Sequence, residues 1–234
     1  MPMSPTRGIR TFRYAVFFDG IDDYGAIPHS DRLVPRDEFT VMGWFNYGGM
    51  KEHGSIVGKS IRPANYTYWV YVSPDQRLCV TFYSTSIPSL CSRAVLSMFR
   101  WYSFAVTWSY PGELRLFIDS MLDNSTASLK EPIDTGGFVT IAELRPGRFM
   151  LLRGWIASLL LYERALSPNE ILHNHQCPED PVRNGLVLWL HAHPDYIKDI
   201  DGDGVLEWID LSGNNNHAKL YGATLATPIK TPLR

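Results

Sequence analysis

The chain has 234 residues, of which 45% are hydrophobic and 13% aromatic, so it is long and apolar enough to bury a full core. Its 22 Lys and Arg residues and 24 Asp and Glu residues leave a formal net charge of -2, which provides no strong field for steering a polyanion and argues against nucleic acid as a partner. No apolar run approaches the ~20 residues of a membrane-spanning helix, and the N-terminus shows no apolar segment of a secretion signal.

The first three quarters of the chain carry the alternation of apolar and polar residues that is typical of half-buried strands. In chain order, this pattern occupies residues 39–45, 66–72, 78–83, 102–108 and 114–118. Clusters of Pro, Gly, Asp and Ser separate several of these segments, which favours tight turns and antiparallel hairpins. The sequence therefore predicts an all-β fold, namely an antiparallel two-sheet jelly-roll sandwich.

One short helix is expected after this strand-rich part. Ser167 suits the N-cap, Pro168 suits the first helical position, and Glu170 stands three residues after the cap, as in a capping box. Residues 176–184 contain two prolines and few apolar residues, which indicates a linker. A buried-strand candidate at 185–190 follows the linker, and residues 227–234 form an extended tail.

The three cysteines, Cys79, Cys91 and Cys177, lack the paired spacing of a zinc site and the density of a disulfide scaffold. We expect buried free thiols at Cys79 and Cys91. The alternative is a bridge between two adjacent strands, which an oxidising compartment would permit. Cys177 then stays single.

Several motifs resemble one family. They are Phe-Asp-Gly-Ile-Asp-Asp-Tyr at 18–24 with Ala-Ile-Pro at 26–28, Phe-Thr-Val-Met-Gly-Trp at 39–44, Ile-Val-Gly-Lys at 56–59, a Trp-to-Trp strand ending in Ala-Val-Thr-Trp at 101–108, Leu-Phe-Ile-Asp at 116–119, and Leu-Tyr-Glu-Arg-Ala-Leu-Ser-Pro-Asn-Glu-Ile at 161–171. Over residues 14–173 the chain resembles the laminin-G-like, concanavalin A-like jelly-roll modules of the lectin/glucanase superfamily. This resemblance implies the same sandwich and a location outside the cell. Ser120 departs from the family, which has glycine after the aspartate.

The C-terminal segment resembles the opening strands of the same modules, although here it follows the body. Its motifs are Gly-Leu-Val-Leu-Trp-Leu at 185–190, a Trp-to-His stretch at 208–217 and Tyr-Gly-Ala at 221–223. We divide the chain into an N-terminal arm (1–13), a jelly-roll body (14–175), a linker (176–184), a strand segment (185–226) and a tail (227–234). The strand segment is too apolar to remain in water, and the residues expected to dock it are Leu186, Leu188, Trp189, Trp208, Leu211 and Leu220.

The sequence leaves two ways to bury this segment. It completes the sandwich of its own chain, or it completes a neighbouring copy by strand donation, which would propagate into a filament. A truncated second repeat is a third way to explain the segment, and its apolar residues argue against this.

Residues 199–210 fit a twelve-position calcium loop. Oxygen ligands recur at alternate positions, and a glycine stands at position six. The expected ligands of Ca²⁺ are Asp199, Asp201, Asp203, the Val205 carbonyl, Glu207 and Asp210. An acidic surface turn is the alternative. A second metal candidate is the group Asp19, Asp22 and Asp23 in the family motif.

Sugar binding and glycosylation each have a weak sequence signal. Tyr66, Tyr68, Trp69 and Tyr71 form an aromatic strand on which sugar rings can stack, although one face of any sandwich strand belongs to the core. Asn65 and Asn124 open glycosylation sequons.

Catalysis has no motif behind it, because Glu113, Glu143, Glu163 and Glu207 each lack a carboxylate partner two or four residues away within a strand. We expect a non-catalytic structural or adhesive protein, extracellular or on a virion surface, that self-assembles through strand complementation. The alternative is a monomeric, calcium-dependent lectin module that binds cell-surface glycans. A glycoside hydrolase is the third interpretation.

Overall fold

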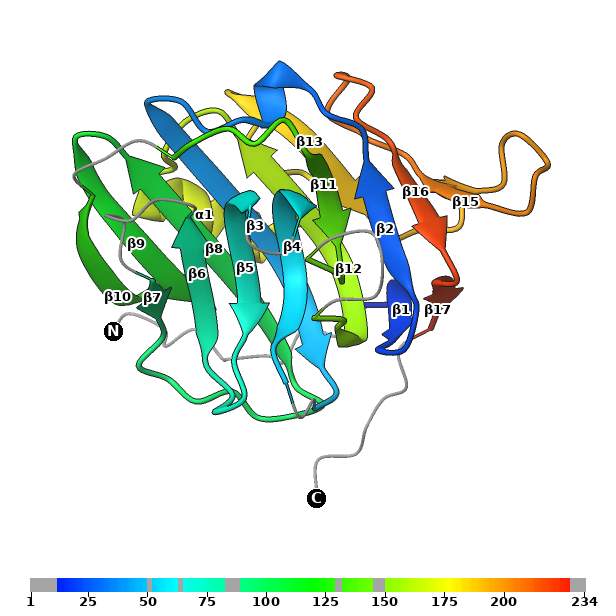
Figure 1. Ribbon diagram of the computed structural model, residues 1–234, viewed down its shortest axis with the longest axis horizontal. Coiled ribbons are helices and arrows are strands. Elements are labelled where there is room, and N and C mark those ends of the chain that lie inside the picture. Colours follow the sequence, from blue (N-terminus) through cyan, green and yellow to red (C-terminus); the bar gives the residue numbers. More distant parts are fainter. Residues whose placement is uncertain are drawn as a thin grey trace, which may run out of the picture.

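The computed structural model describes residues 12–49, 52–62, 65–82, 89–128, 132–144 and 150–227. Within these ranges two antiparallel sheets pack face to face, and the helix α1 (Pro168–Gln176) lies against one of them (Figure 1). The predicted all-β sandwich with one short helix is confirmed. Most of the expected arm and tail lies outside the described residues, as does Tyr83 at the end of one expected strand.

The first sheet, called sheet A, has the strand order β10-β9-β8-β3-β12-β1-β17, and β13 pairs with β12 beside this path. Its strands are β10 (Met121–Ser128), β9 (Gly112–Ile118), β8 (Trp101–Ser109), β3 (Glu38–Tyr47), β12 (Arg153–Tyr162), β1 (Ala15–Asp19), β17 (Thr224–Ala226) and β13 (Leu186–His191).

The second sheet, called sheet B, has the order β14-β15-β16-β2-β11-β4-β5-β6-β7. Its strands are β14 (Ile197–Lys198), β15 (Leu206–Trp208), β16 (Ala218–Tyr221), β2 (Tyr24–Ile27), β11 (Phe138–Ile141), β4 (Gly54–Arg62), β5 (Asn65–Val72), β6 (Leu78–Phe82) and β7 (Leu90–Cys91). A short 3-10 helix, η1 (Asp31–Leu33), follows β2.

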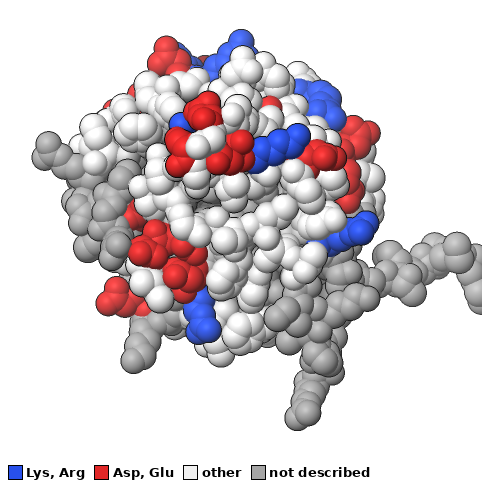
Figure 2. All heavy atoms as spheres, turned by 90° about the vertical axis from the view of Figure 1, so that its right-hand side faces the viewer, with Lys and Arg blue, Asp and Glu red and all other residues white. Residues whose placement is uncertain are grey.

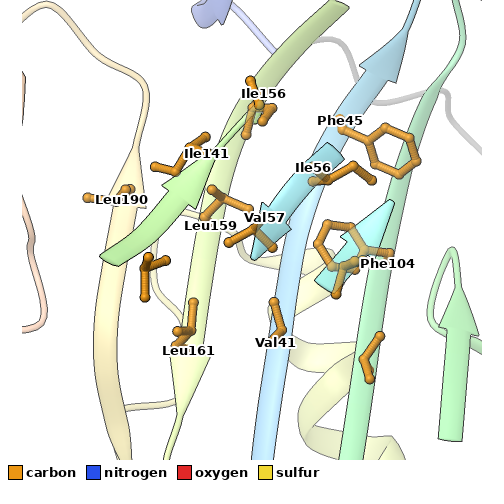
Figure 3. Close-up of a cluster of buried hydrophobic side chains, with 14 of the residues drawn as sticks. Val41, Phe45, Ile56, Val57, Phe104, Ile141, Ile156, Leu159, Leu161 and Leu190 are labelled. Carbon is orange, nitrogen blue, oxygen red and sulfur yellow. The ribbon is translucent and has the colours of Figure 1, made fainter. Parts of the chain in front are cut away.

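The main core lies between the two sheets. Alternate residues of β3 point inward, so Val41 and Phe45, together with Phe104 of β8, face β4 (Figure 3). In β4 a β-bulge after Ser55 lets the neighbours Ile56 and Val57 both enter this core. These side chains are almost fully removed from water. The apolar alternation places one face of each strand on this core. The other face of the central strands is buried as well, since β3, β6 and β8 are buried along almost their whole length, so the expectation of half-buried strands is wrong for them.

The C-terminal segment folds onto the body of its own chain. β13 pairs with β12, β16 pairs with β2, and β17 pairs with β1. Figure 1 shows the red and orange strands closing the right-hand edge of the sandwich beside β1 and β2. Each sheet thus gains strands from residues that are distant in sequence, and no second copy is needed for this pairing.

The apolar residues of this segment divide between two clusters. Leu188, Trp208 and Leu220 enter the main core. Leu186 and Trp189 face the other side of sheet A, where they pack with α1 and with the partly buried Leu211. All six residues expected to dock the segment are therefore buried or partly buried against their own chain.

The helix α1 begins as its sequence predicts. The Ser167 hydroxyl accepts a hydrogen bond from the Glu170 amide, and the Glu170 carboxylate accepts one from the Ser167 amide, 2.9 Å away. The guanidinium of Arg164 lies 2.6 Å from the Glu170 carboxylate and lowers the pKa of Glu170 to about 2. This capping box and ion pair fix the exit of the chain from β12.

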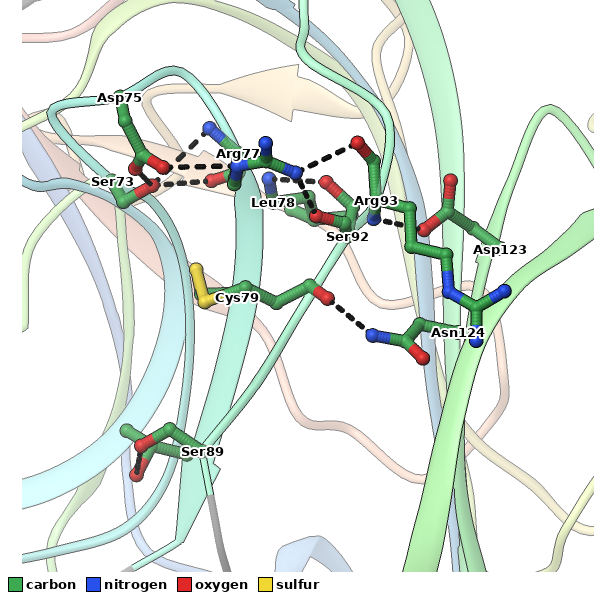
Figure 4. The surroundings of a disulfide bond; sticks show 12 residues. Ser73, Asp75, Arg77, Leu78, Cys79, Ser89, Ser92, Arg93, Asp123 and Asn124 are labelled. Carbon is green, nitrogen blue, oxygen red and sulfur yellow. Dashed lines mark hydrogen bonds and ion pairs between the residues drawn. A yellow bond between two sulfur atoms is a disulfide. The ribbon is translucent and has the colours of Figure 1, made fainter.

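Cys79 and Cys91 form a disulfide, which corrects the expectation of free thiols. They are directly opposite each other in β6 and β7, so their side chains share one face of sheet B. The Asn124 amide donates to the Cys91 carbonyl, and Arg77 donates to the carbonyls of Ser92 and Arg93 (Figure 4). The short strand β7 is thereby tied to β10 and to the turn before β6.

Within the described ranges, no helix combines the length and the apolar character that crossing a bilayer requires.

Candidate functional site

The turn between β1 and β2 gathers three carboxylates. Among the described residues, Asp19, Asp22 and Asp23 form the one group of three or more potential metal ligands whose ligand atoms all lie within 4.8 Å of one another. Carboxylate oxygens are the ligands that Ca²⁺ prefers. This turn, called the acidic turn, therefore has the donor chemistry of a calcium site.

Backbone amides hold the acidic turn in shape. Asp19 Oδ1 accepts from the amides of Ile21 and Asp22, and Asp23 Oδ2 accepts from the amide of Asp19 at 2.8 Å. Burial raises the pKa of Asp23, the hydrogen bond from the Asp19 amide lowers it, and the charges of Asp19 and Asp22 raise it again, leaving it above its ordinary value. A bound cation would remove that repulsion.

The C-terminal segment borders the acidic turn. A Cβ at Gly222 would stand 2.2 Å from Asp23 Oδ1, and Gly222 has a φ of 73°, so both space and backbone favour glycine there. The rings of Tyr24 and Tyr221 stack beside it at 4.7 Å. Figure 2 shows the side of the molecule that this segment helps to form, where acidic side chains gather in separate groups.

The predicted calcium loop forms a turn that projects from the sandwich between β14 and β15 (Figure 1). Asp199 accepts from the amides of Gly202 and Gly204, and Asp203 accepts from the amide of Val205. Lys219 lies 3.5 Å from Asp201 and 3.7 Å from Glu207. The carboxylates of this loop do not form a group of three within 4.8 Å.

Asp210, the expected twelfth position, serves another purpose. Its carboxylate is buried and accepts from the amides of Trp189, Ser212 and Asn216 and from the Ser212 hydroxyl. These bonds occupy the oxygens that the calcium hypothesis assigned to the metal. Calcium binding by the twelve-position loop stays a prediction.

The aromatic strand β5 divides between the two faces of sheet B. Tyr68 points into the main core and is 1% exposed, so burial raises the pKa of its hydroxyl and its ring is not available to a sugar. Trp69 and Tyr71 lie on the outer face, stacked on each other at 3.8 Å, and each is 8% exposed. Tyr66 is partly exposed and packs against the same cluster.

The two sequons differ in their surroundings. Asn124 lies in β10, and both ends of its side-chain amide are engaged, since Nδ2 donates to the Cys91 carbonyl and Oδ1 accepts from the Ser125 amide. Asn65 is partly exposed at the start of β5. Glycosylation stays a prediction, and Asn65 is the better placed acceptor.

β4 holds a buried cation that the sequence did not predict. Lys59 of β4 is fully buried, and its ammonium nitrogen lies 2.6 Å from the Gly137 carbonyl, 2.7 Å from His29 Nδ1 and 3.4 Å from Asp134 Oδ1. Burial lowers the pKa of Lys59, and Asp134 partly offsets this. The one sequence signal was a lysine inside an apolar strand. Because all three ammonium protons have partners, we assign this group a structural role.

The glutamates considered for catalysis do not form a pair. Glu113 lies on β9 beside Arg115, whereas Glu207 lies on β15 beside Lys219. Glu143 is fully buried after β11, and Glu163 follows β12. Within the described chain, these four residues thus occupy four separate places.

Three solved structures have a similar fold. A "putative carbohydrate binding protein" from Bacteroides ovatus is 15% identical with a TM-score of 0.75, and the match covers 96% of this chain and 62% of that protein. A heptameric SAP-like pentraxin from Limulus polyphemus is 14% identical with a TM-score of 0.65, and the match covers 94% and 98%. Domain 4 of a Geobacillus stearothermophilus arabinanase, in complex with arabinotriose, is 17% identical with a TM-score of 0.53, covering 68% and 75%.

At these identities the likeness shows a shared fold, and the chain spans less than two thirds of the Bacteroides protein. No curated protein sequence matches the chain. A family model described as the concanavalin A-like lectin/glucanases superfamily matches residues 19–172, which form most of the chain and include the acidic turn and the capping box of α1. The chain therefore belongs to the laminin-G-like branch of the concanavalin A-like lectin/glucanase superfamily.

Proposed function

We propose that the protein is a non-catalytic, lectin-like carbohydrate-binding module that works outside the cell. The observation that carries this proposal is a completed two-sheet sandwich, similar over 96% of the chain to the Bacteroides protein described as carbohydrate binding. The arabinanase domain in complex with arabinotriose supports the same ligand class. A sugar-binding module needs only a rigid surface with aromatic and polar groups, and a packed sandwich provides such a surface.

The carboxylates favour binding over hydrolysis. Glycoside hydrolysis in most families requires two carboxyl groups about 5 to 9.5 Å apart across one site. The acidic turn brings the ligand oxygens of three carboxylates within 4.8 Å of one another, which supports cation binding over an acid and a nucleophile on opposite sides of a bond. Glu113 and Glu207, on different sheets, each lie beside a basic side chain.

The disulfide and the family support the proposed location. The Cys79–Cys91 bond joins adjacent strands, and such bonds persist in oxidising compartments. Glycans that such modules bind are displayed in the same environment. An extracellular protein is consistent with both.

Self-assembly by strand donation remains a prediction from the sequence. The prediction assumed that the C-terminal segment needs strands of a sandwich to pair with. In the structure β13, β16 and β17 pair with strands of their own chain. We therefore favour a monomer over a filament. Light scattering at high concentration checks this: one mass near 26.6 kDa is expected, and a concentration-dependent ladder would restore the filament hypothesis.

The test of the proposed function is a glycan screen. Fluorescently labelled protein is applied to arrays of polysaccharides and oligosaccharides with calcium or with chelator, and each bound glycan is incubated with the protein and assayed for new reducing ends. We expect saturable binding to a restricted set of glycans without release of reducing ends. Retention of no glycan overturns the proposal, and release of product replaces it with the hydrolase.

A further inference from the structure

Four side chains form a row across the outer face of sheet A. Phe17 of β1 is directly opposite Trp155 of β12, Trp155 is opposite Asn46 of β3, and Asn46 is opposite Trp101 of β8. Their chain neighbours Val16, Ile156, Phe45 and Tyr102 belong to the main core. Because alternate strand residues face opposite sides, the row faces away from that core. We call it the aromatic row.

Aromatic rings in this row are accessible from outside. Phe17, Trp155 and Trp101 are all partly exposed, and the rings of Phe17 and Trp155 lie 5.1 Å apart. Phe12 packs against Trp101 at 5.1 Å and closes that end of the row. The result is a set of partly exposed rings on a rigid sheet surface, fixed by strand pairing rather than by loops.

Asn46 lies between the two indoles and lacks a partner. It is 6% exposed, and its Oδ1 atom is buried with no hydrogen bond among the described residues. A buried amide oxygen without a partner is unfavourable, and native proteins rarely keep one without a reason. If the side chains that cover this oxygen part, a ligand hydroxyl that donates to it would supply the missing bond.

A second buried polar atom on the same face of β3 lacks a hydrogen-bond partner, but we do not assign it to ligand binding. The indole nitrogen of Trp44, two residues along β3, also has no partner. Phe12 packs against the Trp44 ring at 5.0 Å, and His175 of α1 stacks on it at 4.8 Å. Trp44 is thus covered by its own chain, so we assign it no ligand contact.

Charged side chains border the row. Asp19 and Arg153 are directly opposite each other, two residues beyond Phe17 and Trp155 on the same strand faces. The acidic turn therefore begins about 7 Å from the aromatic row, at the rise of two strand residues. A ligand on the row would have a cation-binding turn and a guanidinium at its edge.

We infer that the aromatic row is the sugar-binding platform of this protein, with one pyranose ring seated over Asn46 between Trp155 and Trp101. This rests on the proposed function. A pyranose has an apolar C–H face that packs on an indole and hydroxyls that bond an amide. Trp155 and Trp101 are each one strand from Asn46, so their backbones are ~10 Å apart, which is the width that one ring with its hydroxyls fills.

The experiment measures affinity for the glycan that the screen identifies, using titration calorimetry on the full chain. Trp155→Ala and Asn46→Leu are the platform variants, Tyr66→Ala tests the outer face of sheet B, and Phe138→Ala, an aromatic residue 47% exposed on β11, is the matched control. We expect the platform variants to bind on the order of tenfold more weakly or worse, and the other two to bind as the wild type does.

Thermal unfolding separates binding from folding. Asn46→Leu removes an unpartnered buried polar group, so its Tm is expected to equal or exceed that of the wild type while its affinity falls, which a purely structural role for Asn46 would not produce. If both platform variants keep wild-type affinity, or if Tyr66→Ala alone loses it, the platform is wrong and the proposed function stands. If the wild type binds no glycan, both the platform and the proposed function are wrong.

Discussion

The buried carboxylate of Asp210 accepts a hydrogen bond from the backbone amide of Trp189, 2.9 Å away, and so ties the chain after β15 to β13. The same carboxylate accepts from the amides of Ser212 and Asn216. One side chain thereby organises the turn between β15 and β16 of sheet B and ties it to β13 of sheet A. A residue that the sequence suggests as a metal ligand thus also anchors that turn.

Replacing Asp210 by alanine is expected to destabilise the protein by about 3 kcal/mol, because several buried amide donors lose a charged acceptor at once. The free energy of unfolding from urea denaturation measures this. Asp201→Ala is the control, since Asp201 is exposed and its one ion pair with Lys219 is long, and we expect a change within about 0.5 kcal/mol. Equal effects of the two substitutions would show that Asp210 does not anchor the turn.

The capping box of α1 predicts an acid-dependent loss of stability. The pKa of Glu170 is about 2, held low first by the hydrogen bond from Arg164, against 4.5 for the ordinary group. A depressed pKa means that the contribution to stability is complete above pH 4.5 and is lost as the pH falls towards 2.

We therefore expect Glu170→Gln to lower the free energy of unfolding by about 1 kcal/mol at pH 6, and the difference from wild type to shrink by pH 2.5. Denaturation at both pH values tests this. Ser167→Ala, which removes the reciprocal cap without removing the charge, serves as the control and should show a weaker pH dependence. A difference that grows towards low pH would contradict the assignment.

The buried Lys59 predicts a coupling with Asp134. Burial raises the pKa of Asp134, but the Gly136 amide and the Lys59 ammonium lower it below its ordinary value, so the two charges support each other. Asp134→Ala leaves the buried ammonium of Lys59 without its carboxylate partner, whereas in a Lys59→Met background the same change removes no counter-ion.

A double-mutant cycle should give a coupling on the order of 1 kcal/mol between Lys59 and Asp134. The measurement is the free energy of unfolding of the wild type, both single variants and the double variant. Asp31, 3.5 Å from His29, provides the comparison, because Asp31→Ala should couple to Lys59 far more weakly. Additive effects of Lys59→Met and Asp134→Ala would show that the ion pair contributes nothing.

Calcium binding is predicted from the sequence, and the structure offers two acidic segments for it. The acidic turn brings its carboxylates together, whereas the loop 199–210 does not. We expect calcium to raise Tm, by an amount equivalent to about 2.7 kcal/mol at one hundred times Kd, and Asp22→Asn to abolish the rise.

Asp203→Asn is the matched variant on the loop and should keep the rise in Tm. If Asp203→Asn abolishes the rise in Tm and Asp22→Asn keeps it, the calcium site is the loop 199–210. If calcium and chelator give the same Tm in the wild type, both segments are only turns.

The sequence by itself determined the local features of this protein. Alternation over residues 39–45 predicted β3 (Glu38–Tyr47) because successive side chains of a strand point to opposite faces, although the structure buries both faces of this strand. Ser167, Pro168 and Glu170 predicted the start of α1 because a capping box closes within four residues. The family motifs predicted the sandwich because they mark strands and turns, and the form of these elements depends on residues that are close in sequence.

Only the tertiary structure decided which distant residues meet. The register of β12 with β1 and β3 brings Phe17, Trp155 and Asn46 into one row, and no spacing in the sequence contains that register. The docking of β13 decided that the Asp210 carboxylate would accept a hydrogen bond from the amide of Trp189, 21 residues earlier in the chain. Hydrogen bonding between strands and burial of their faces join residues that are distant in sequence. Which side chains share a surface is therefore known only once the strands have paired in their register.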